Sequence, residues 1–297
     1  MLKGLAITPP VIGRISIGRV VERNGKRLPE KDDQFTLTSQ VQNREGWILH
    51  PLDEVLRKDA GGKLRSIPVR MLFNDPALNL RADYSLFDRT TGRPMCVGNG
   101  ESCRRAGKDG IESLPCPSPQ GCGFGMADCK PYARFNVLVG DEDEMGTFVL
   151  RTTSYNTIRT LAARLQYFQA VSGGLLACMP LELKLRGKST TMSFRAAIYY
   201  VDLVPRSGMS LEEAITEARR IDAARQKAGF DQGALDEAAR QGFANGAFEE
   251  LDEDVPAVVE EFFPEGEKAP AKLVGTSTRS TNLTGRLQDK VALIGTG

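Results

Sequence analysis

Apolar and polar residues alternate with a period of two near the start of the chain. Between residues 11 and 21, Ile15 and Ile17 fall on one side of an extended backbone and polar residues fall on the other. This alternation predicts a half-buried β-strand. An Asn-Gly turn signal and a charged stretch follow, and a second strand is predicted at 35–38. The two strands together predict a β-hairpin.

The rest of the first two hundred residues is predicted to be mostly strands with one long helix. Ile158, Leu161, Leu165 and Phe168 recur at spacings of three and four, which predicts an amphipathic helix over 155–171. Further strands are predicted at 67–73, 134–139, 147–152, 180–185 and 193–204.

The last third of the chain is predicted to be helical at first and then unstructured. Ser210 and Glu213 have the spacing of a capping box, which predicts the start of a helix that runs toward Gly229. A shorter helix is predicted from 231 to about 241. Residues 245–297 are acidic at first and then rich in Gly, Ser and Thr. This composition predicts a disordered tail.

The sequence therefore predicts an α+β protein. Residues 1–208 form a β-rich core domain that contains a cysteine-rich loop at 93–132, residues 209–244 form a helical extension, and residues 245–297 form the tail. A start without a signal-peptide pattern, and the absence of any apolar run of 18 residues, predict a cytoplasmic protein with no membrane association.

Charge is unevenly distributed along the chain, although the total is only +1. Residues 1–208 hold 29 Lys and Arg against 21 Asp and Glu, whereas residues 209–297 hold 10 against 17. A basic body of this kind is typical of proteins that contact nucleic acid. The alternative interpretation is a solvated surface with an acidic, solubilising tail.

Five of the six cysteines fall within 34 residues, in a loop rich in Gly, Pro and Ser. Such a loop contains too little apolar material for a core, and without a secretory signal its cysteines indicate metal ligands rather than disulfides. We therefore expect one structural Zn²⁺ ion. The alternative is a set of reduced, buried thiols. The five candidate ligands are Cys96, Cys103, Cys116, Cys122 and Cys129.

The sequence contains no recognisable set of catalytic residues. Its one histidine, His50, lies in an apolar stretch that favours a structural role. Cys178, in Leu-Leu-Ala-Cys-Met, is expected to be a plain core residue. No phosphate-binding loop, nucleophile elbow or His-Glu-x-x-His motif is present. We therefore expect no catalytic residues and no enzymatic activity.

The order of several motifs resembles the recombination-directionality-factor-like family of phages and integrative or conjugative elements, over roughly residues 8–205. The residues that carry this resemblance are Val11–Gly18, Asp33–Ser39, Leu78-Asn79-Leu80-Arg81, the clustered cysteines, and Thr152–Asn156. Some members of that family bind a large serine integrase and change which attachment sites it recombines, while others carry only metal-binding or hydrolase labels.

The resemblance implies which cysteines bind zinc. Cys96, Cys116, Cys122 and Cys129 match the family's four, and Cys103 departs from the pattern and becomes an alternate ligand. It also implies a non-enzymatic accessory protein of mobile-element recombination. Its partner would be a recombinase or integrase, or another recombination protein, with DNA as a second partner.

Two other functions remain open from the sequence. One is a metal-dependent hydrolase or nuclease that uses carboxylates such as Asp75, Asp83 and Asp88. The other is a single-stranded-DNA-binding module, in which Phe135 beside Arg134 would stack on bases. For the accessory-protein hypothesis, the residues expected to contact DNA or the partner are Arg104, Arg105, Arg14 and Arg19.

Overall fold

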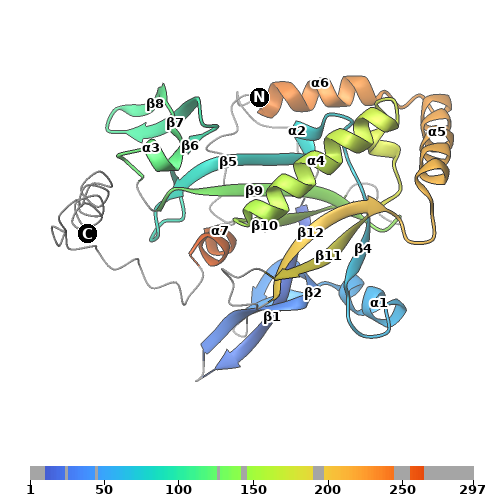
Figure 1. Ribbon diagram of the computed structural model, residues 1–297, viewed down its shortest axis with the longest axis horizontal. Helices are drawn as coiled ribbons and strands as arrows, with labels where there is room; N and C mark the ends of the chain where they lie inside the picture. Colours follow the sequence, from blue (N-terminus) through green and yellow to red (C-terminus); the bar gives the residue numbers. More distant parts are fainter. Residues whose placement is uncertain are drawn as a thin grey trace, which may run out of the picture. The chain divides into compact units, whose positions relative to one another are not determined.

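The computed structural model describes residues 11–23, 26–43, 46–125, 128–141, 146–189, 197–243 and 255–263. The chain divides into two units, Met1–Glu265 and Gly266–Gly297, and every described residue belongs to the first. The described part is α+β, as the sequence predicts (Figure 1). None of its helices is long and apolar enough to cross a membrane.

The described strands form one mixed sheet of twelve strands. Its main path runs β3-β2-β1-β10-β9-β5-β6-β7-β8, and β1 and β10 are the parallel pair in this path. A branch leaves β9 through β4, which pairs with β11, which in turn pairs with β12. The bounds are β1 (Val11–Arg23), β2 (Lys26–Asn43), β3 (Gly46–Leu49), β4 (Ser66–Arg70), β5 (Leu80–Phe87), β6 (Pro94–Gly98), β7 (Ser102–Gly107), β8 (Gly110–Pro115), β9 (Lys130–Val139), β10 (Thr147–Thr152), β11 (Leu181–Ser189) and β12 (Ala197–Pro205).

The predicted N-terminal hairpin is confirmed as the antiparallel pair of β1 and β2. Phe35 and Leu37 of β2 are fully buried, because alternate residues of the strand face the core. Helix α1 (Pro51–Asp59) follows β3, and His50 caps it: the His50 Nδ1 accepts a hydrogen bond from the Leu52 backbone N–H. The lone histidine is therefore structural, as its apolar surroundings suggested.

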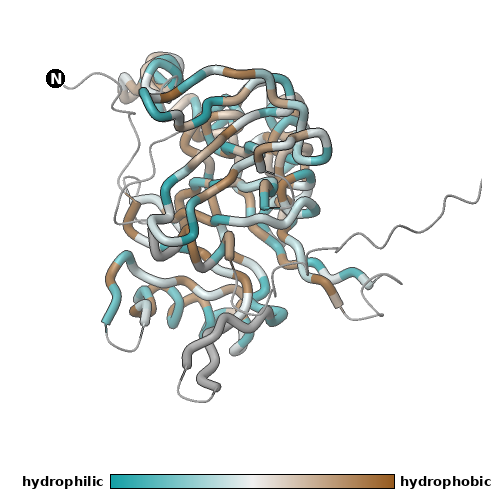
Figure 2. The backbone as a smooth tube through the Cα atoms, turned by 90° about the vertical axis from the view of Figure 1, so that its left-hand side faces the viewer, coloured by the Kyte–Doolittle hydropathy of each residue, from teal (hydrophilic) through white to brown (hydrophobic). Residues whose placement is uncertain are grey.

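Helix α4 (Tyr155–Val171) covers the core face of the sheet (Figure 1). The Ser154 hydroxyl accepts a hydrogen bond from the Thr157 N–H, which fixes the start of the helix. The predicted apolar stripe is confirmed, and Leu161 and Leu165 are fully buried. Each such leucine contributes about 1.5–3 kcal/mol to folding. Figure 2 shows how hydrophobic and hydrophilic residues follow one another along the backbone.

Three short strands occupy the cysteine-rich loop, together with helix α3 (Ser118–Gly121). The pattern predicts a region without long elements, and the structure gives it a β-meander of β6, β7 and β8 at one end of the sheet path. This meander arranges the cysteines, and the sequence pattern did not reveal it.

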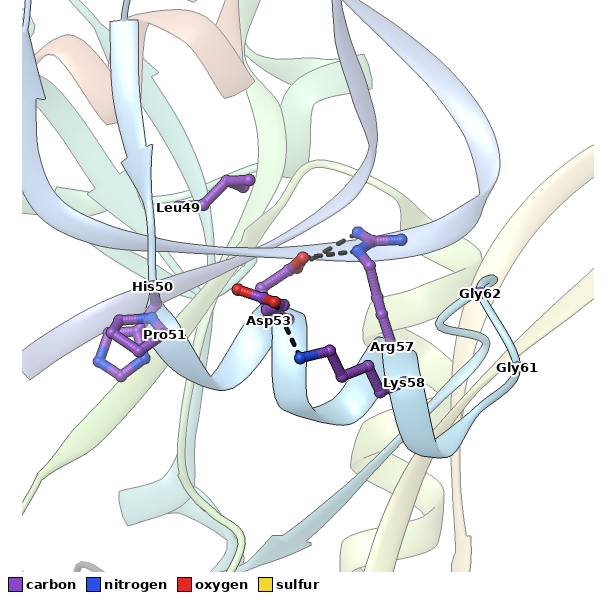
Figure 3. Close-up of a pocket in the computed structure, with 9 residues that line it drawn as sticks. Leu49, His50, Pro51, Asp53, Arg57, Lys58, Gly61 and Gly62 are labelled. Atoms are coloured by element: carbon purple, nitrogen blue, oxygen red, sulfur yellow. Dashed lines mark hydrogen bonds and ion pairs between the residues drawn. The ribbon is translucent and has the colours of Figure 1, made fainter.

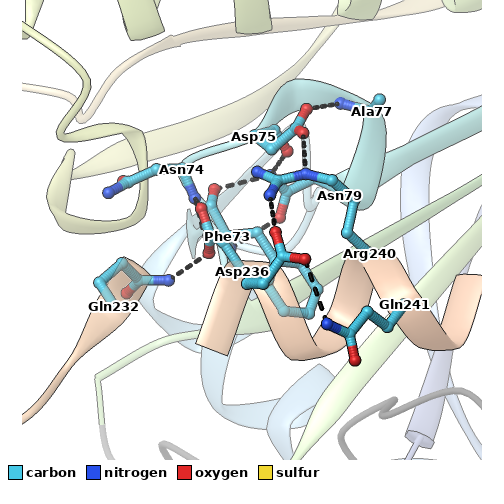
Figure 4. A network of polar contacts seen from close by, with 10 residues as sticks. Phe73, Asn74, Asp75, Ala77, Asn79, Gln232, Asp236, Arg240 and Gln241 are labelled. Carbon is cyan, nitrogen blue, oxygen red and sulfur yellow. Dashed lines mark hydrogen bonds and ion pairs between the residues drawn. The ribbon is translucent and has the colours of Figure 1, made fainter. Parts of the chain in front are cut away.

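Helices α5 (Leu211–Lys227) and α6 (Gln232–Phe243) form the predicted extension, and the capping box of Ser210 and Glu213 is present. Figure 4 shows how α6 is fixed to the short segment before helix α2 (Pro76–Asn79). The buried Asp236 carboxylate accepts hydrogen bonds from the Asn74 N–H (3.1 Å) and the Gln232 amide (2.8 Å). The extension is thus joined to the core by specific buried contacts.

Residues 255–263 differ from the prediction of a disordered tail. Val255–Phe262 form helix α7, and its Val258 and Phe262 are fully buried. The acidic composition of this segment masked two apolar positions at a spacing of four, which form one helix face. The other residues of the predicted tail lie outside the described residues.

We expect Asp141, two residues after the end of β9, to make a pH-dependent contribution to stability. The Arg206 guanidinium, with Arg70 nearby, lowers the pKa of the Asp141 carboxyl below its ordinary value of 3.8. A carboxylate with a lowered folded-state pKa stabilises the fold above its ordinary pKa, and that stability is lost as the pH falls below it.

Asp141→Asn should therefore lower the free energy of unfolding at pH 7, by under about 1 kcal/mol because water screens this half-exposed pair. Urea titrations at pH 7, 5 and 3 should show the wild-type advantage persisting to about pH 4 and shrinking below it. Asp109→Asn, in the exposed turn after β7, is the control. An advantage that grew on acidification would contradict the assignment.

Candidate functional site

Three of the clustered cysteines share one face of the β6–β8 meander. Cys96 lies on β6 and Cys103 on β7, and the register pairs Gly98 with Cys103. Cys116 follows β8, and its N–H donates to the Glu101 carbonyl (2.9 Å). A Cβ atom on Gly98 would lie 2.6 Å from the Cys103 Cβ and 2.9 Å from the Cys116 Sγ. Gly98 therefore leaves the room in which the sulfur atoms approach one another.

Gly98→Ala should disrupt this cluster. The added methyl group has no space between Cys103 and Cys116, so the strands must separate, which costs about 1–3 kcal/mol. Gly123→Ala is the matched control in the same loop, because a Cβ there meets no atom within 4 Å. Chemical denaturation of the two variants provides the comparison. Equal stabilities would show that the meander does not pack as described.

Cys122 and Cys129 come together through a tight turn. The backbone N–H groups of Gly125 and Phe124 donate to Cys122 and lower the pKa of its thiol. The Cys129 N–H donates to the Gly125 carbonyl (3.2 Å), and a Cβ on Gly125 would lie 2.8 Å from the Cys129 Cβ. Backbone N–H groups aimed at a sulfur stabilise the thiolate, which is the form that binds metals.

The five thiols lie close enough to affect one another. Burial raises the pKa of Cys129 to about 11, and the charges of Cys96, Cys122, Cys116 and Cys103 add to this effect. The pKa of Cys103 is also raised to about 11. Burial is the largest cause, and a hydrogen bond with Cys96 contributes to the same shift. Sulfur is the donor that structural zinc prefers, so the donor chemistry fits this metal. Within the described residues, no three His, Cys, Asp or Glu side chains have the geometry of an assembled metal site.

The two arginines of the loop point to opposite faces of β7, because side chains alternate along a strand. Arg105 pairs with Cys96 in the register, so the two side chains share one face of the meander. Its guanidinium carbon lies 4.0 Å from the centre of the Phe124 ring. Arg104 lies on the other face, paired with Val97. The expected partner-binding pair is therefore split: Arg105 belongs to the thiol cluster and Arg104 does not.

The other two arginines that the sequence singled out lie on β1. Arg14 is buried, and its guanidinium carbon stacks 3.9 Å from the centre of the Trp47 ring. This arginine joins β1 to β3, two strands along the sheet path. Arg19 pairs with Glu30 in the backbone register, and its side chain lies outside the described residues.

A shallow depression of about 800 Å³ lies beside α1 (Figure 3). Its polar groups serve the fold: Asp53 binds Arg57 and the Leu37 N–H, and Glu54 pairs with Lys58. Burial lowers the pKa of His50, whose Nδ1 already caps the helix. These side chains form a structural network, and nothing in their arrangement indicates a reaction.

The sequence prediction missed a row of arginines that crosses three central strands. The register places Arg81 of β5 opposite Arg134 of β9, and Arg134 opposite Arg151 of β10. Their sheet face is opposite to the face that buries Phe135 and Leu150 in the core. Each arginine follows an apolar or small residue that faces inward, which indicates a strand position directed away from the core. The alignment of the three depends on strand register, which the sequence does not encode locally.

The row is not purely cationic. Asp83 of β5 lies on the same face, and burial raises the pKa of its carboxyl, while the charges of Arg81 and Arg134 lower it. Three arginines directly across adjacent strands would repel one another without anionic groups nearby. The face therefore combines a local excess of positive charge with at least one internal carboxylate.

A comparison with protein-family models identifies the chain. The model of the Gp3-like, recombination directionality factor-like family matches residues 12–206. The chain belongs to this family. Among curated proteins and among solved structures, none matches it. Family membership indicates a role in DNA recombination and an origin in phages or other mobile elements.

The matched range of this recombination directionality factor-like chain includes all five clustered cysteines and the arginine row, and it excludes α5, α6 and α7. Two motifs that suggested the family have structural roles. The buried Asn79 side chain accepts hydrogen bonds from the Leu72 and Phe73 N–H groups and donates to the Phe73 carbonyl. Ser154 caps α4.

Proposed function

We propose that this chain is a zinc-binding accessory protein of mobile-element DNA recombination, which acts by binding a recombinase, DNA or both. The family match carries the recombination role, and the cluster of five thiols at the end of the sheet supports the metal. The protein catalyses no reaction in this proposal. It changes the outcome of recombination by occupying a surface of its partner.

Zinc would hold the meander together. Among the described residues, the apolar cluster around the buried thiols contains only Leu86 and Leu114 besides the cysteines. So small a core stabilises a loop weakly, whereas a structural zinc ion contributes its binding energy to folding. We assign the ligands to Cys96, Cys116, Cys122 and Cys129, and Cys103 is the alternate.

The carboxylates considered for a hydrolytic metal site have structural roles instead. Asp75 caps α2 and pairs with Arg240, at 3.3 Å. Asp88 accepts hydrogen bonds from the N–H groups of Thr90 and Thr91 in the turn after β5. Asp83 lies on the arginine face of β5. The contacts given for these three described carboxylates are separate from one another, so our proposal does not use them as a metal site.

Binding assays with the recombinase encoded nearby test the proposal. We expect Arg104→Ala to weaken binding about tenfold, because arginines on a rigid, metal-held loop often dominate an interface. Arg219→Ala, exposed on α5 beyond the family-matched range, is the matched control. Titration calorimetry or surface plasmon resonance at two salt concentrations measures both variants.

The same titrations include duplex DNA. A DNA affinity that falls steeply with added salt indicates direct phosphate contacts, because bound counterions are released. Affinity for the recombinase alone, with little dependence on salt, indicates a protein interface. A wild-type protein that bound neither the recombinase nor DNA would overturn the proposal.

A further inference from the structure

Helix α7 is seated on the sheet face that carries the arginine row. Its Phe262 is fully buried, and the ring centre lies 4.9 Å from that of Phe87 on β5 and 6.2 Å from that of Tyr132 on β9. The Lys130 ammonium group donates to the Phe262 carbonyl at 3.4 Å. Phe87, Tyr132 and Lys130 thus form a socket for one aromatic side chain at the end of a helix.

Thr153 of the body binds an acidic residue of the same segment, and we include it in the socket. The Glu261 carboxylate accepts hydrogen bonds from the Thr153 N–H (3.0 Å) and the Thr153 hydroxyl (3.5 Å). Phe263 follows, with its ring 4.9 Å from that of Phe262 and 5.4 Å from the Arg89 guanidinium carbon. The last two residues of α7, Glu261 and Phe262, and Phe263 directly after the helix therefore each have a defined contact on the body.

The socket and α7 differ in their position relative to the family-matched range of the chain. Phe87, Tyr132 and Thr153 lie inside residues 12–206, which the family model matches, whereas α7 lies outside that range. The socket therefore lies in the family-matched part of the chain, and its occupant lies beyond that part. Between α6 and α7, residues 244–254 connect the occupant to the body.

The contact between α7 and the socket is small enough for another ligand to replace α7. An eight-residue helix is marginal on its own in water. The described contact includes two fully buried side chains, Val258 and Phe262, together with the hydrogen bonds of Glu261 and of the Phe262 carbonyl. A short tether raises the effective concentration of such a segment to the order of millimolar, which keeps a weak ligand bound most of the time.

We propose that this socket is a docking site for an acidic, aromatic helix of a recombination protein, and that α7 occupies it in cis as a competitor. The identity of the partner rests on the proposed function, while the socket itself does not. The partner segment would present a carboxylate followed by two aromatic residues on one end of a helix, as α7 does. Binding of the partner displaces α7.

The charge of the surrounding face suits such a ligand. Arg151 of β10 is buried on this face, two residues before Thr153, whose N–H donates to Glu261. Arg134 and Arg81 continue the row across the sheet. A positive face steers an acidic helix toward the socket and accelerates association, an effect that added salt reduces.

A peptide-binding experiment tests the proposal without any recombinase. A labelled peptide of residues 255–263 is titrated with the full-length wild-type protein and with Phe262→Ala, and fluorescence anisotropy reports binding. We expect the variant to bind at least about tenfold more tightly than the wild type, because its own α7 no longer fills the socket. Raising the salt concentration should weaken binding.

The controls separate competition from general damage. Phe230→Ala removes an exposed phenylalanine between α5 and α6 and should bind the peptide no better than the wild type. A peptide with alanine in place of its first phenylalanine should not bind. Circular dichroism establishes that Phe262→Ala folds. If it does not, Glu261→Gln, which retains the aromatic anchor, replaces it and should still bind more tightly than the wild type.

Two results would overturn the proposal. One is a folded variant that binds the peptide no better than the wild type, which would make α7 a permanent part of the fold. The other is displacement of the peptide by duplex DNA as effectively as by unlabelled peptide, which would assign the face to nucleic acid. Neither result bears on zinc content or recombinase capture, so failure here is distinguishable from failure of the proposed function.

Discussion

Replacement of Cys122 by serine is expected to release the metal from the purified protein and to unfold the β6–β8 meander. Wild-type protein purified without chelators should carry close to one equivalent of zinc. The Cys122 sulfur accepts backbone hydrogen bonds from Phe124 and Gly125, a geometry that favours the thiolate and fixes it for coordination. A structural zinc ion contributes on the order of 10 kcal/mol to the folding of the segment that binds it, so loss of one ligand has a large effect.

Elemental analysis and limited proteolysis of the loop measure the two consequences. Cys103→Ser tests the ligand assignment: zinc is retained if Cys103 is the fifth, non-ligating thiol, and lost if it replaces one of the other four. Cys178→Ser is the control outside the cluster, since Cys178 is buried in the main core and should leave the zinc content unchanged. Wild-type protein without zinc would refute the metal proposal.

The elements that the sequence predicted well are those encoded by neighbouring residues. The capping box at Ser210, the apolar stripe of α4 and the alternation in β1 each depend on residues at most four positions apart. Interactions over such distances act within one element, so their pattern survives in the sequence. The same reasoning explains why His50 was correctly interpreted as structural.

What the sequence did not reveal depends on strand register. The row of Arg81, Arg134 and Arg151 joins residues up to 70 positions apart, and a shift of one residue in either pairing would move an arginine to the core face. Arg104 and Arg105 are a second example. Adjacent basic residues resemble one binding patch in sequence, but a strand directs them to opposite faces.

Helix α7 shows how composition obscures a docking segment. Its surroundings are strongly acidic, which predicts disorder, yet two buried apolar side chains four residues apart are enough to seat one short helix on an existing socket. Such a segment does not need to form a core of its own. The stability of α7 therefore depends on Phe87 and Tyr132, which lie more than a hundred residues earlier in the chain.

Asp53→Ala is expected to cause the second large effect, on the stability of the whole β-rich body. Asp53 is buried, and its carboxylate accepts hydrogen bonds from the Leu37 N–H (2.8 Å) and the Arg57 guanidinium (2.5 Å). Arg57 also donates to the Phe35 carbonyl, so one pair joins α1 to the most buried part of β2. Its removal leaves a partly buried guanidinium without its counter-charge, which costs about 3 kcal/mol.

Thermal unfolding should show this loss as a decrease in Tm of about 6–12 °C for a unit of this size. Glu54→Ala is the matched control: Glu54 is the next residue of α1 and also pairs with a cation four positions later, Lys58, at 3.0 Å, but both side chains are more than 70% exposed. Exposed pairs of this kind contribute about 0.3–0.5 kcal/mol. Asp53→Asn retains an acceptor for the Leu37 N–H and removes only the charge. Its Tm should therefore lie between those of Asp53→Ala and Glu54→Ala. Equal effects of Asp53→Ala and Glu54→Ala would show that burial of this carboxylate does not anchor α1 to the sheet.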